Sequence, residues 1–398
     1  MACTSVRKVM LFSHDAHPQM VTGAEKALLQ LGEACQNHGW SAAWVSPRAG
    51  LATSRAAEMG FEVRVEPFPL LWSLIHEPHR VAEAIQLLNS FAEQSPLHQV
   101  ILDFQPDLIV ANSAINGLPA FLASARKIPL WWYIHEIIPG GKGMGPLLSL
   151  LHSCSDRILV PSADVEKSVS RKDQNPQKVV RLPYFTAIPP YPALLQAQKS
   201  IRHKFGWTNE TAIVGWFGAI YPGKGLLEAI KSLSCVSRID QQVVLAAAGT
   251  VVDPVYFQTC LDEARQNRCI DFQYLGVFSD IEQILPAVDI VVIPSLVEEA
   301  FPNIALEAMA CGKCIAAYRS GGLKELVIQG ETGYLSPKGD CLALGAFIRE
   351  LLPDPVKRMQ MGKKGREAAG KTYTKEIFYR QIREMLSQLM PAKRQAKE

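Results

Sequence analysis

Short apolar runs alternate along the chain with longer segments that carry apolar residues at helical spacing, and this alternation predicts the fold class. In the first half of the chain we expect strands at residues 6–12, 40–45, 61–65, 107–111, 130–135, 157–161 and 179–182. The segments between them, such as 23–38, 51–59 and 72–95, have the apolar spacing of amphipathic helices. Alternating strands and helices are typical of a parallel, doubly wound α/β sheet.

A second series of the same kind starts after a proline-rich segment. Residues 183–199 contain four prolines and no apolar periodicity, so we interpret residues 186–200 as a linker between two domains. Further strands are expected at 212–217, 243–248, 272–275, 289–293 and 314–317, and two helices broken near Thr372 are expected within 357–390. The linker therefore separates a domain at 1–185 from one at 201–372, and a terminal segment at 373–398 follows.

Two glutamates, Glu299 and Glu307, follow the strand expected at 289–293 and are separated by seven residues. Ligands of open α/β folds bind at the carboxyl ends of strands, where helix N-termini direct amides towards anions. We place Pro302 at the first helical position, which proline suits, so the next two amides are expected to be free. One carboxylate can then meet a sugar, the amides a phosphate and the other carboxylate a ribose. This is the outline of a sugar-nucleotide site.

The motif resembles the E-x7-E signature of the retaining glycosyltransferases with two Rossmann-like domains, the GT-B fold, and most closely glycosyltransferase family 4. The similarity continues through residues 307–312, 321–325 and 330–335, and it is weaker but traceable over most of the chain. The resemblance implies an N-terminal acceptor domain, a C-terminal nucleotide-sugar domain and a last helix within 373–398 that returns to the N-terminal domain.

The resemblance also implies which residues bind the donor. They are Gly23, Gly218, Lys224, Phe301, Asn303, Ile304 and Glu307. Lys224 lies in a glycine-rich loop and matches the family's lysine for the diphosphate, but the matching arginine position holds Ala219. An arginine fork gives bidentate phosphate contacts that a lysine does not replace. Gly23 lies in a segment similar to the family's Gly-Gly-Ala-Glu, with Thr22 in place of the first glycine, and an ordinary helix start is the alternative interpretation.

The catalytic residues implied by the resemblance are His135 and Glu299. His135 ends an expected strand and matches the histidine that faces the donor sugar, although a structural role is the alternative for a histidine at a strand end. Glu299 would bond to sugar hydroxyls and favour a developing oxocarbenium ion, and Glu307 would accept from the ribose hydroxyls. Acidic side chains also complement a helix N-terminus, but Glu307 lies too deep in the expected helix for that explanation.

The implied reaction moves a sugar from a nucleotide diphosphate-sugar to an acceptor hydroxyl with retention of configuration, in polysaccharide or glycoconjugate biosynthesis. The acceptor class stays open among sugars, lipid-linked molecules and small metabolites. The chain has no Asp-x-Asp pair, so we expect no required metal and no other cofactor. Two alternatives remain open. A GT-B sugar-nucleotide epimerase would use His135 and Glu136 as part of an acid/base set, and Ala219 favours a non-catalytic nucleotide-sugar-binding or partner protein.

Composition and charge restrict the remaining classes. Apolar residues make up 48% of the chain and charged residues 20%, and no apolar run has the length of a membrane helix. Nine cysteines are present, and Cys311 and Cys314 have no second pair, which indicates reduced thiols in a cytoplasmic protein. Residues 357–398 contain twelve Lys or Arg against four Glu. Solvated helix faces explain this excess, and a peripheral contact with anionic lipid is the alternative. Nucleic acid is not expected as a partner, because the basic excess is confined to the C-terminal segment.

Overall fold

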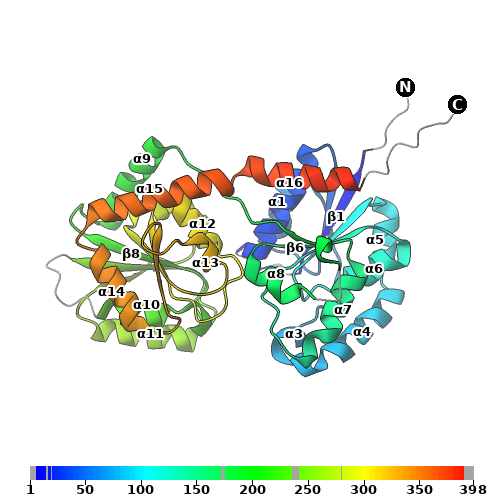
Figure 1. Cartoon of the computed structure of the whole chain (residues 1–398), viewed down its shortest axis with the longest axis horizontal. Coiled ribbons are helices and arrows are strands. Elements are labelled where there is room, and N and C mark those ends of the chain that lie inside the picture. The colour runs from blue at the N-terminus through cyan, green and yellow to red at the C-terminus, as the bar shows by residue number, and fades with distance from the viewer. Residues whose placement is uncertain are drawn as a thin grey trace. The chain divides into compact units, whose positions relative to one another are not determined.

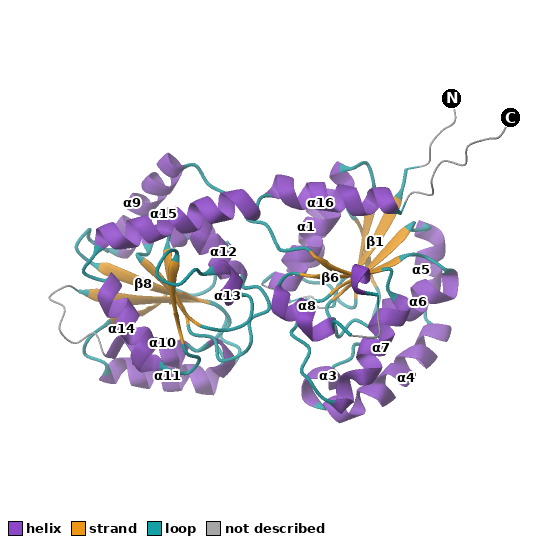
Figure 2. Ribbon diagram, in the orientation of Figure 1, coloured by secondary structure: helices purple, strands orange, loops and turns teal. Residues whose placement is uncertain are grey.

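The computed structural model describes residues 6–14, 17–18, 20–171, 175–234, 242–278 and 280–389. The chain divides into two compact units, one of Met1–Tyr184 with Glu376–Glu398 and one of Phe185–Lys375 (Figure 1). In each unit a parallel sheet is covered by helices on both faces (Figure 2). This architecture confirms the α/β class with two Rossmann-like sheets that the alternating pattern predicts.

The N-terminal unit, within the described residues, contains a sheet of seven parallel strands in the order β3-β2-β1-β4-β5-β6-β7. The strands are β1 Lys8–Phe12, β2 Ser41–Ser46, β3 Glu62–Val65, β4 Leu108–Asn112, β5 Leu130–Tyr133, β6 Arg157–Val160 and β7 Val179–Arg181. The helices are α1 Gly23–Asn37, α2 Leu51–Glu58, α3 Ser73–His76, α4 Val81–Glu93, α5 Leu97–Phe104, α6 Leu118–Arg126, α7 Gly145–Cys154, α8 Ala163–Val169 and α16 Lys375–Gln388. The strand order reverses between β1 and β4, which is where doubly wound sheets bind ligands.

The C-terminal unit contains, in its described part, a sheet of six parallel strands in the order β10-β9-β8-β11-β12-β13. The strands are β8 Ala212–Phe217, β9 Val243–Ala248, β10 Asp271–Tyr274, β11 Ile290–Ile293, β12 Cys314–Tyr318 and β13 Gly333–Ser336. The helices are α9 Tyr191–Phe205, α10 Leu226–Ser234, α11 Pro254–Gln266, α12 Asn303–Ala310, α13 Leu323–Leu326, α14 Cys341–Leu351 and α15 Pro355–Thr372. All residues of β8, β9, β11 and β12 are buried. Helices cover both faces of the sheet, so the central strands have no solvated side. Their sequences are therefore continuous apolar runs.

The prediction of one long helix at residues 72–95 is wrong in one respect, because the helix is interrupted in the structure. Helix α3 ends at His76, a short 3-10 turn covers Pro78–Arg80, and α4 begins at Val81. Glu77, directly before the proline, has φ −140° and ψ 66°, outside the helical region. The proline ring clashes with a helical conformation of the residue before it, which accounts for the break.

The proline-rich segment read as a linker is partly helical. Helix α9 begins at Tyr191, with Pro190 as its N-cap and Pro192 in its first turn. Proline is tolerated there, because the first turn of a helix has no internal acceptor for its amide nitrogens. The same prolines that indicate a linker are therefore compatible with a helix start. The break predicted near Thr372 is confirmed, since α15 ends at Thr372 and α16 begins at Lys375.

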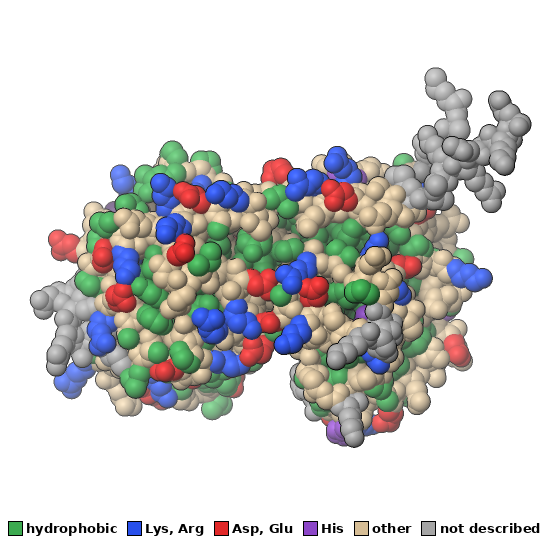
Figure 3. Space-filling view, in the orientation of Figure 1, with side chains coloured by type: hydrophobic (Ala, Val, Ile, Leu, Met, Phe, Trp, Pro, Cys, Tyr) green, Lys and Arg blue, Asp and Glu red, His purple; other side chains and the backbone are tan. Residues whose placement is uncertain are grey.

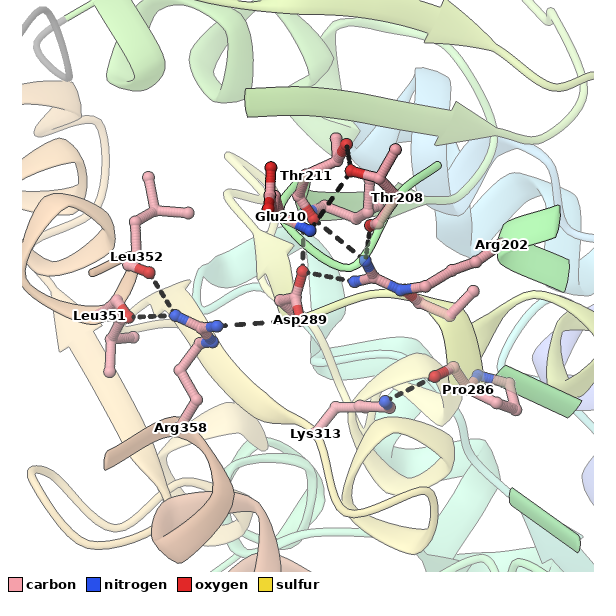
Figure 4. Close-up of polar contacts among 12 residues, drawn as sticks. Arg202, Thr208, Glu210, Thr211, Pro286, Asp289, Lys313, Leu351, Leu352 and Arg358 are labelled. Carbon is pink, nitrogen blue, oxygen red and sulfur yellow. Dashed lines mark hydrogen bonds and ion pairs between the residues drawn. The ribbon is translucent and has the colours of Figure 1, made fainter. Parts of the chain in front are cut away.

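A largely buried charge cluster fixes the amino end of β11 (Figure 4). Asp289 directly precedes this strand, and its Oδ2 accepts from Arg202 Nη2 at 2.7 Å and from Ile213 N at 2.8 Å. Arg202 also donates to the carbonyls of Ala287, Thr208 and Thr211 at 2.8–3.0 Å. Arg358 on α15 contacts the other Asp289 oxygen at 3.9 Å. The strand that leads to the Glu299 loop is thus anchored by charged groups at its opposite end.

None of the described helices has the combination of length and apolar character that a bilayer-spanning segment requires.

Candidate active site

The carboxylate of Glu299 is held by two donors just beyond the carboxyl end of β11. Its Oε1 accepts from Ser295 Oγ at 2.5 Å and from Lys224 Nζ at 2.6 Å. Glu299 is 9% exposed and Ser295 is 2% exposed. No described residue bonds to Glu299 Oε2, and this oxygen is not enclosed. One carboxylate oxygen is thus anchored, and the other is available to a ligand.

The structure brings Lys224 and Glu299 together, although they lie 75 residues apart in the sequence. The resemblance assigns Lys224 to the diphosphate and Glu299 to the sugar. Here the two side chains form an ion pair, and Lys224 is 29% exposed at the side chain. A diphosphate bound at this point would compete with Glu299 for the ammonium group, because each oxyanion favours the same cation.

The loop that carries Glu299 is pinned to the loop after β12 through the backbone. Glu299 N donates to Ser320 Oγ at 3.1 Å, and Gly322 N donates to Glu299 O at 2.7 Å. Gly321 has φ +44°, and a Cβ there would lie 1.8 Å from Glu299 O. Gly321 N also donates to the carboxylate of Glu298 at 2.9 Å. Only glycine allows this approach of the two backbones.

The loops after β8, β9 and β11 are packed with similar closeness. A Cβ on Gly249 would lie 1.7 Å from Gly218 O, and a Cβ on Gly225 would lie 1.9 Å from Pro294 O. Both glycines have positive φ, +151° and +73°. Gly218, predicted to bind donor, therefore lies at the carboxyl edge of the sheet beside the loop that follows β9, and a Cβ on it would lie 4.0 Å from Lys224 Cγ. Main-chain groups can come close to a ligand where no side chain intervenes.

Helix α12 begins one residue later than predicted. Pro302 is the N-cap, with φ −73° and ψ 118°, so Asn303 is the first helical residue and the placement of Pro302 inside the helix is wrong. Within the described part of the chain, no acceptor for the Asn303 or Ile304 amide is found, whereas Ala305 N bonds to Pro302 O at 3.1 Å. Two amides at a helix N-terminus are suited to an anion.

The remaining two predicted residues of this segment are both buried. Glu307 is 8% exposed on α12. Phe301 is 5% exposed and packs edge-on against Tyr373, with ring centroids 5.6 Å apart. The Phe301 side chain thus has a packing partner inside the unit, and its assignment to the donor stays a prediction.

In the N-terminal unit, Thr22 and Glu25 form a capping box at the start of α1. Glu25 N donates to Thr22 Oγ1 at 3.3 Å, and both Thr22 N and Thr22 Oγ1 donate to Glu25 Oε2 at 2.9 Å. This geometry satisfies the helix end by itself. It explains Thr22 and Glu25 as a helix start, while Gly23 is exposed at the first position of α1.

His135 lies beyond the carboxyl end of β5 with both ring nitrogens engaged. Nε2 is 2.7 Å from Asn112 Oδ1, and Nδ1 is 2.6 Å from the Tyr184 hydroxyl. Asn112 Nδ2 donates to Ala24 O at 3.1 Å, which directs the amide oxygen towards His135. Oxygen only accepts here, so Nε2 carries the proton and Nδ1 accepts from Tyr184. Burial, with a contribution from Glu136, raises the pKa of Tyr184, so its hydroxyl remains a donor.

The same surroundings keep the imidazole neutral. Burial, with a smaller contribution from His14, holds the pKa of His135 well below its usual value. We therefore expect His135 to be neutral and protonated at Nε2 at pH 6, whereas a histidine with the ordinary pKa of about 6.5 is mainly charged at that pH. Long-range ¹⁵N–¹H correlation spectra of the folded protein measure the tautomer directly. The same residue in urea-unfolded protein is the control and should be mainly charged at pH 6. A charged ring or an Nδ1–H tautomer in the folded protein contradicts the assignment.

Two family models match the chain, one in each unit. The model described as "Glycosyl transferase 4-like domain" matches residues 22–184, and the model described as "Glycosyl transferases group 1" matches residues 197–368. This chain belongs to the family 4-like glycosyltransferases of the GT-B fold. The match of the second model includes Glu299, Glu307 and Lys224.

Curated relatives are moderately similar in sequence to this chain over part of their length. It is 28% identical over 205 residues to a GDP-mannose-dependent monoacylated alpha-(1-6)-phosphatidylinositol monomannoside mannosyltransferase of Corynebacterium glutamicum, covering 49% of this chain and 52% of the relative. It is 26% identical over 251 residues to a D-inositol 3-phosphate glycosyltransferase of Corynebacterium jeikeium, covering 60% and 53%. The chain thus spans about half the length of the curated relatives that it matches.

Solved structures resemble this chain in fold over nearly its whole length. HepE of Anabaena, in a complex with UDP-glucose, has a TM-score of 0.76 at 20% identity and covers 96% of this chain and 99% of its own. WaaG, a glycosyltransferase involved in lipopolysaccharide biosynthesis, has a TM-score of 0.68 at 14% identity and covers 94% and 98%. At these identities the likeness establishes the fold, and it agrees with the GT-B architecture.

Several polar residues that contact predicted site residues within each unit were not predicted from the sequence. They are Asn112, Tyr184, Ser295, Glu298 and Ser320. Serine and asparagine are common at strand ends and in turns, so no sequence signal sets these positions apart. Their partners are known only once the strands are in place.

The basic excess of residues 357–398 is partly used inside the fold. Arg366 donates to the carbonyls of Ala310 and Pro189, and Lys357 pairs with Glu350. Lys364 lies 3.8 Å from Glu331. On the face that Figure 3 shows, Lys and Arg side chains are interspersed with Asp and Glu side chains. These three of the twelve basic residues therefore have acidic or carbonyl partners, and the lipid contact stays a prediction.

In the described ranges, no group of three or more His, Cys, Asp or Glu residues is arranged to hold a metal ion. The expectation of no required metal or cofactor stays a prediction.

Proposed function

We propose that the chain transfers a sugar from a nucleotide diphosphate-sugar to an acceptor hydroxyl with retention of configuration. The observation that carries the proposal is the Glu299 carboxylate, which has one anchored and one open oxygen. It lies in the segment matched by the group 1 model, and Lys224 is bonded to it. One similar protein is a GDP-mannose-dependent mannosyltransferase, and the similar HepE structure is a complex with UDP-glucose, which supports a nucleotide-sugar donor.

In this proposal the open Glu299 oxygen accepts from hydroxyls of the donor sugar, and its charge favours the oxocarbenium ion. The diphosphate lies against the Asn303 and Ile304 amides and recruits Lys224 as its charge grows. The bond from the anomeric carbon to the phosphate oxygen breaks, and the acceptor oxygen bonds to the anomeric carbon on the same face. The acceptor proton passes to the departing phosphate oxygen. Catalysis rests on positioning and electrostatics.

The epimerase alternative is less well supported. An epimerase needs groups that can exchange protons at the sugar. His135 has both nitrogens bonded, and Glu136 accepts from Ser113 Oγ, from Ala114 N at 2.9 Å and from His135 N at 3.1 Å. Ala219 favours a second candidate, a nucleotide-sugar-binding protein without turnover, because the matching arginine is absent.

A binding panel tests the proposed donor and the role of Glu307. Titration calorimetry with UDP, GDP, ADP and their glucose or mannose conjugates should show selective binding to one nucleotide series. Glu307→Gln is expected to weaken that binding by about 10- to 100-fold, since hydrogen bonds to charged groups contribute about 1.5–3 kcal/mol. Glu331→Gln, which removes an exposed charge paired with Lys364, is the matched control and should bind as the wild type does.

The outcomes separate the two candidate functions. Turnover of the selected nucleotide-sugar, measured as release of the nucleoside diphosphate with a panel of acceptors, supports the transferase. Binding without turnover for any acceptor supports the non-catalytic protein. No binding of any nucleotide, or equal binding by the wild type and Glu307→Gln, contradicts the site.

A further inference from the structure

Two buried serines hold Glu299, one through its side chain and one through its backbone. Ser295 is 2% exposed, and its hydroxyl donates to the carboxylate at 2.5 Å. Ser320 is 1% exposed, and its oxygen accepts from the Glu299 amide at 3.1 Å. The two serines come from the ends of different strands, β11 and β12, which are neighbours in the sheet. Side chain and backbone of the same glutamate are thus fixed independently.

The Ser320 contact is itself held in place. Its hydroxyl can donate to Val297 O at 3.0 Å or to the Glu298 carboxylate at 3.3 Å. Glu298 also pairs with Lys338 and accepts from Gly321 N, and the Lys338 contact, with a smaller contribution from Gly321 N, lowers the pKa of Glu298. Glu298 therefore remains a charged acceptor for this loop, and its neighbour Glu299 keeps its place.

The Ser295 contact differs from the Lys224 contact in what a donor would do to it. Lys224 is partly exposed and charged, so a bound diphosphate attracts it away from Glu299. Ser295 is neutral and buried, so a diphosphate attracts its hydroxyl less strongly than it attracts the Lys224 ammonium group. When the donor binds, Ser295 is the side-chain partner that remains on Glu299 Oε1.

We propose that Ser295 and Ser320 are positioning residues that keep the open oxygen of Glu299 aimed at the donor sugar while Lys224 is recruited by the diphosphate. The inference rests on the proposed transferase function. Reactive groups need to be held to within about 0.5 Å, and a displacement of about 1 Å can lower a rate by about 100-fold. The two serines act through Glu299, so their loss should change turnover more than donor affinity.

Steady-state kinetics of four variants tests the proposal. Ser295→Ala is expected to lower kcat by about 10- to 100-fold with donor KM changed by less than about threefold, and Ser295→Thr should recover most of the rate. Ser320→Ala, the second and independent variant, should also lower kcat. Ser336→Ala is the matched control. Ser336 lies at the end of β13, is 0% exposed, and its hydroxyl donates to Ala317 O on β12. It should keep the wild-type kcat.

A kcat of Ser295→Ala within threefold of the control, or equal losses in the alanine and threonine variants, overturns the proposal. Crystal structures of the unliganded Lys224→Ala protein, alone and combined with Ser295→Ala or with Ser336→Ala, give a readout that needs no activity, because Lys224 otherwise also holds Glu299 Oε1. The Glu299 carboxylate should turn away from its position only in the combination with Ser295→Ala. If the wild type shows no turnover, the proposed function fails, and the crystal structures still decide whether Ser295 positions Glu299. An unmoved carboxylate overturns the proposal.

Discussion

Replacement of Glu299 by glutamine is expected to lower kcat by about 100- to 1,000-fold, the range seen when a preorganised electrostatic group is removed from a transition state. Glutamine keeps the shape of the side chain and an oxygen that accepts from Ser295 and Lys224. What is lost is the negative charge beside the developing oxocarbenium ion. Because that charge matters most in the transition state, donor KM should change by less than about tenfold.

The measurement is the initial rate of nucleoside diphosphate release at saturating donor and acceptor. Glu331→Gln, which removes an exposed carboxylate elsewhere in the same unit, should have the wild-type rate. A Glu299→Gln rate within threefold of the wild type would show that the charge is not used in the reaction. Glu299 would then serve only to bind Lys224.

Replacement of Asp289 by alanine is expected to lower the free energy of unfolding by about 3 kcal/mol, near the lower end of the range for breaking a buried ion pair. The Arg202 side chain is 8% exposed and would lose its carboxylate partner while remaining buried. Arg202 keeps its bonds to the carbonyls of Ala287, Thr208 and Thr211, which limits the loss. The Ile213 amide would also lose its acceptor.

Urea unfolding followed by tryptophan fluorescence measures this loss. Asp262→Ala is the matched control, because Asp262 pairs with Arg265 at 2.8 Å but both side chains are more than half exposed. Exposed pairs contribute about 0–1 kcal/mol, so this control should change stability little. Equal stabilities of the two variants would mean that the Asp289 cluster in Figure 4 does not anchor β11.

The strands were the most predictable part of the fold. β8 and β9 have the predicted bounds, at 212–217 and 243–248. Strand β13, Gly333–Ser336, was missed as an element, although its first three residues lie in the family-similar segment 330–335. It is a short edge strand that begins with glycine, and a Cβ on Gly333 would lie 2.3 Å from Ile315 O. Where two backbones pack this closely, the strand needs a glycine in place of an apolar side chain. The sequence of β13 therefore carries no periodic apolar signal.

The sequence by itself determined the α/β class, because burial of the central strands on both faces requires continuous apolar runs and covering helices require apolar residues at helical spacing. It also placed Glu299 and Glu307 beside a strand end and a helix start, since these are local patterns. Only the tertiary structure decided that Lys224 pairs with Glu299 and that Asn112 and Tyr184 bond to His135. These residues lie far apart in the chain. Their contacts depend on the order of the strands and on how each crossover returns to the sheet, which local periodicity does not encode.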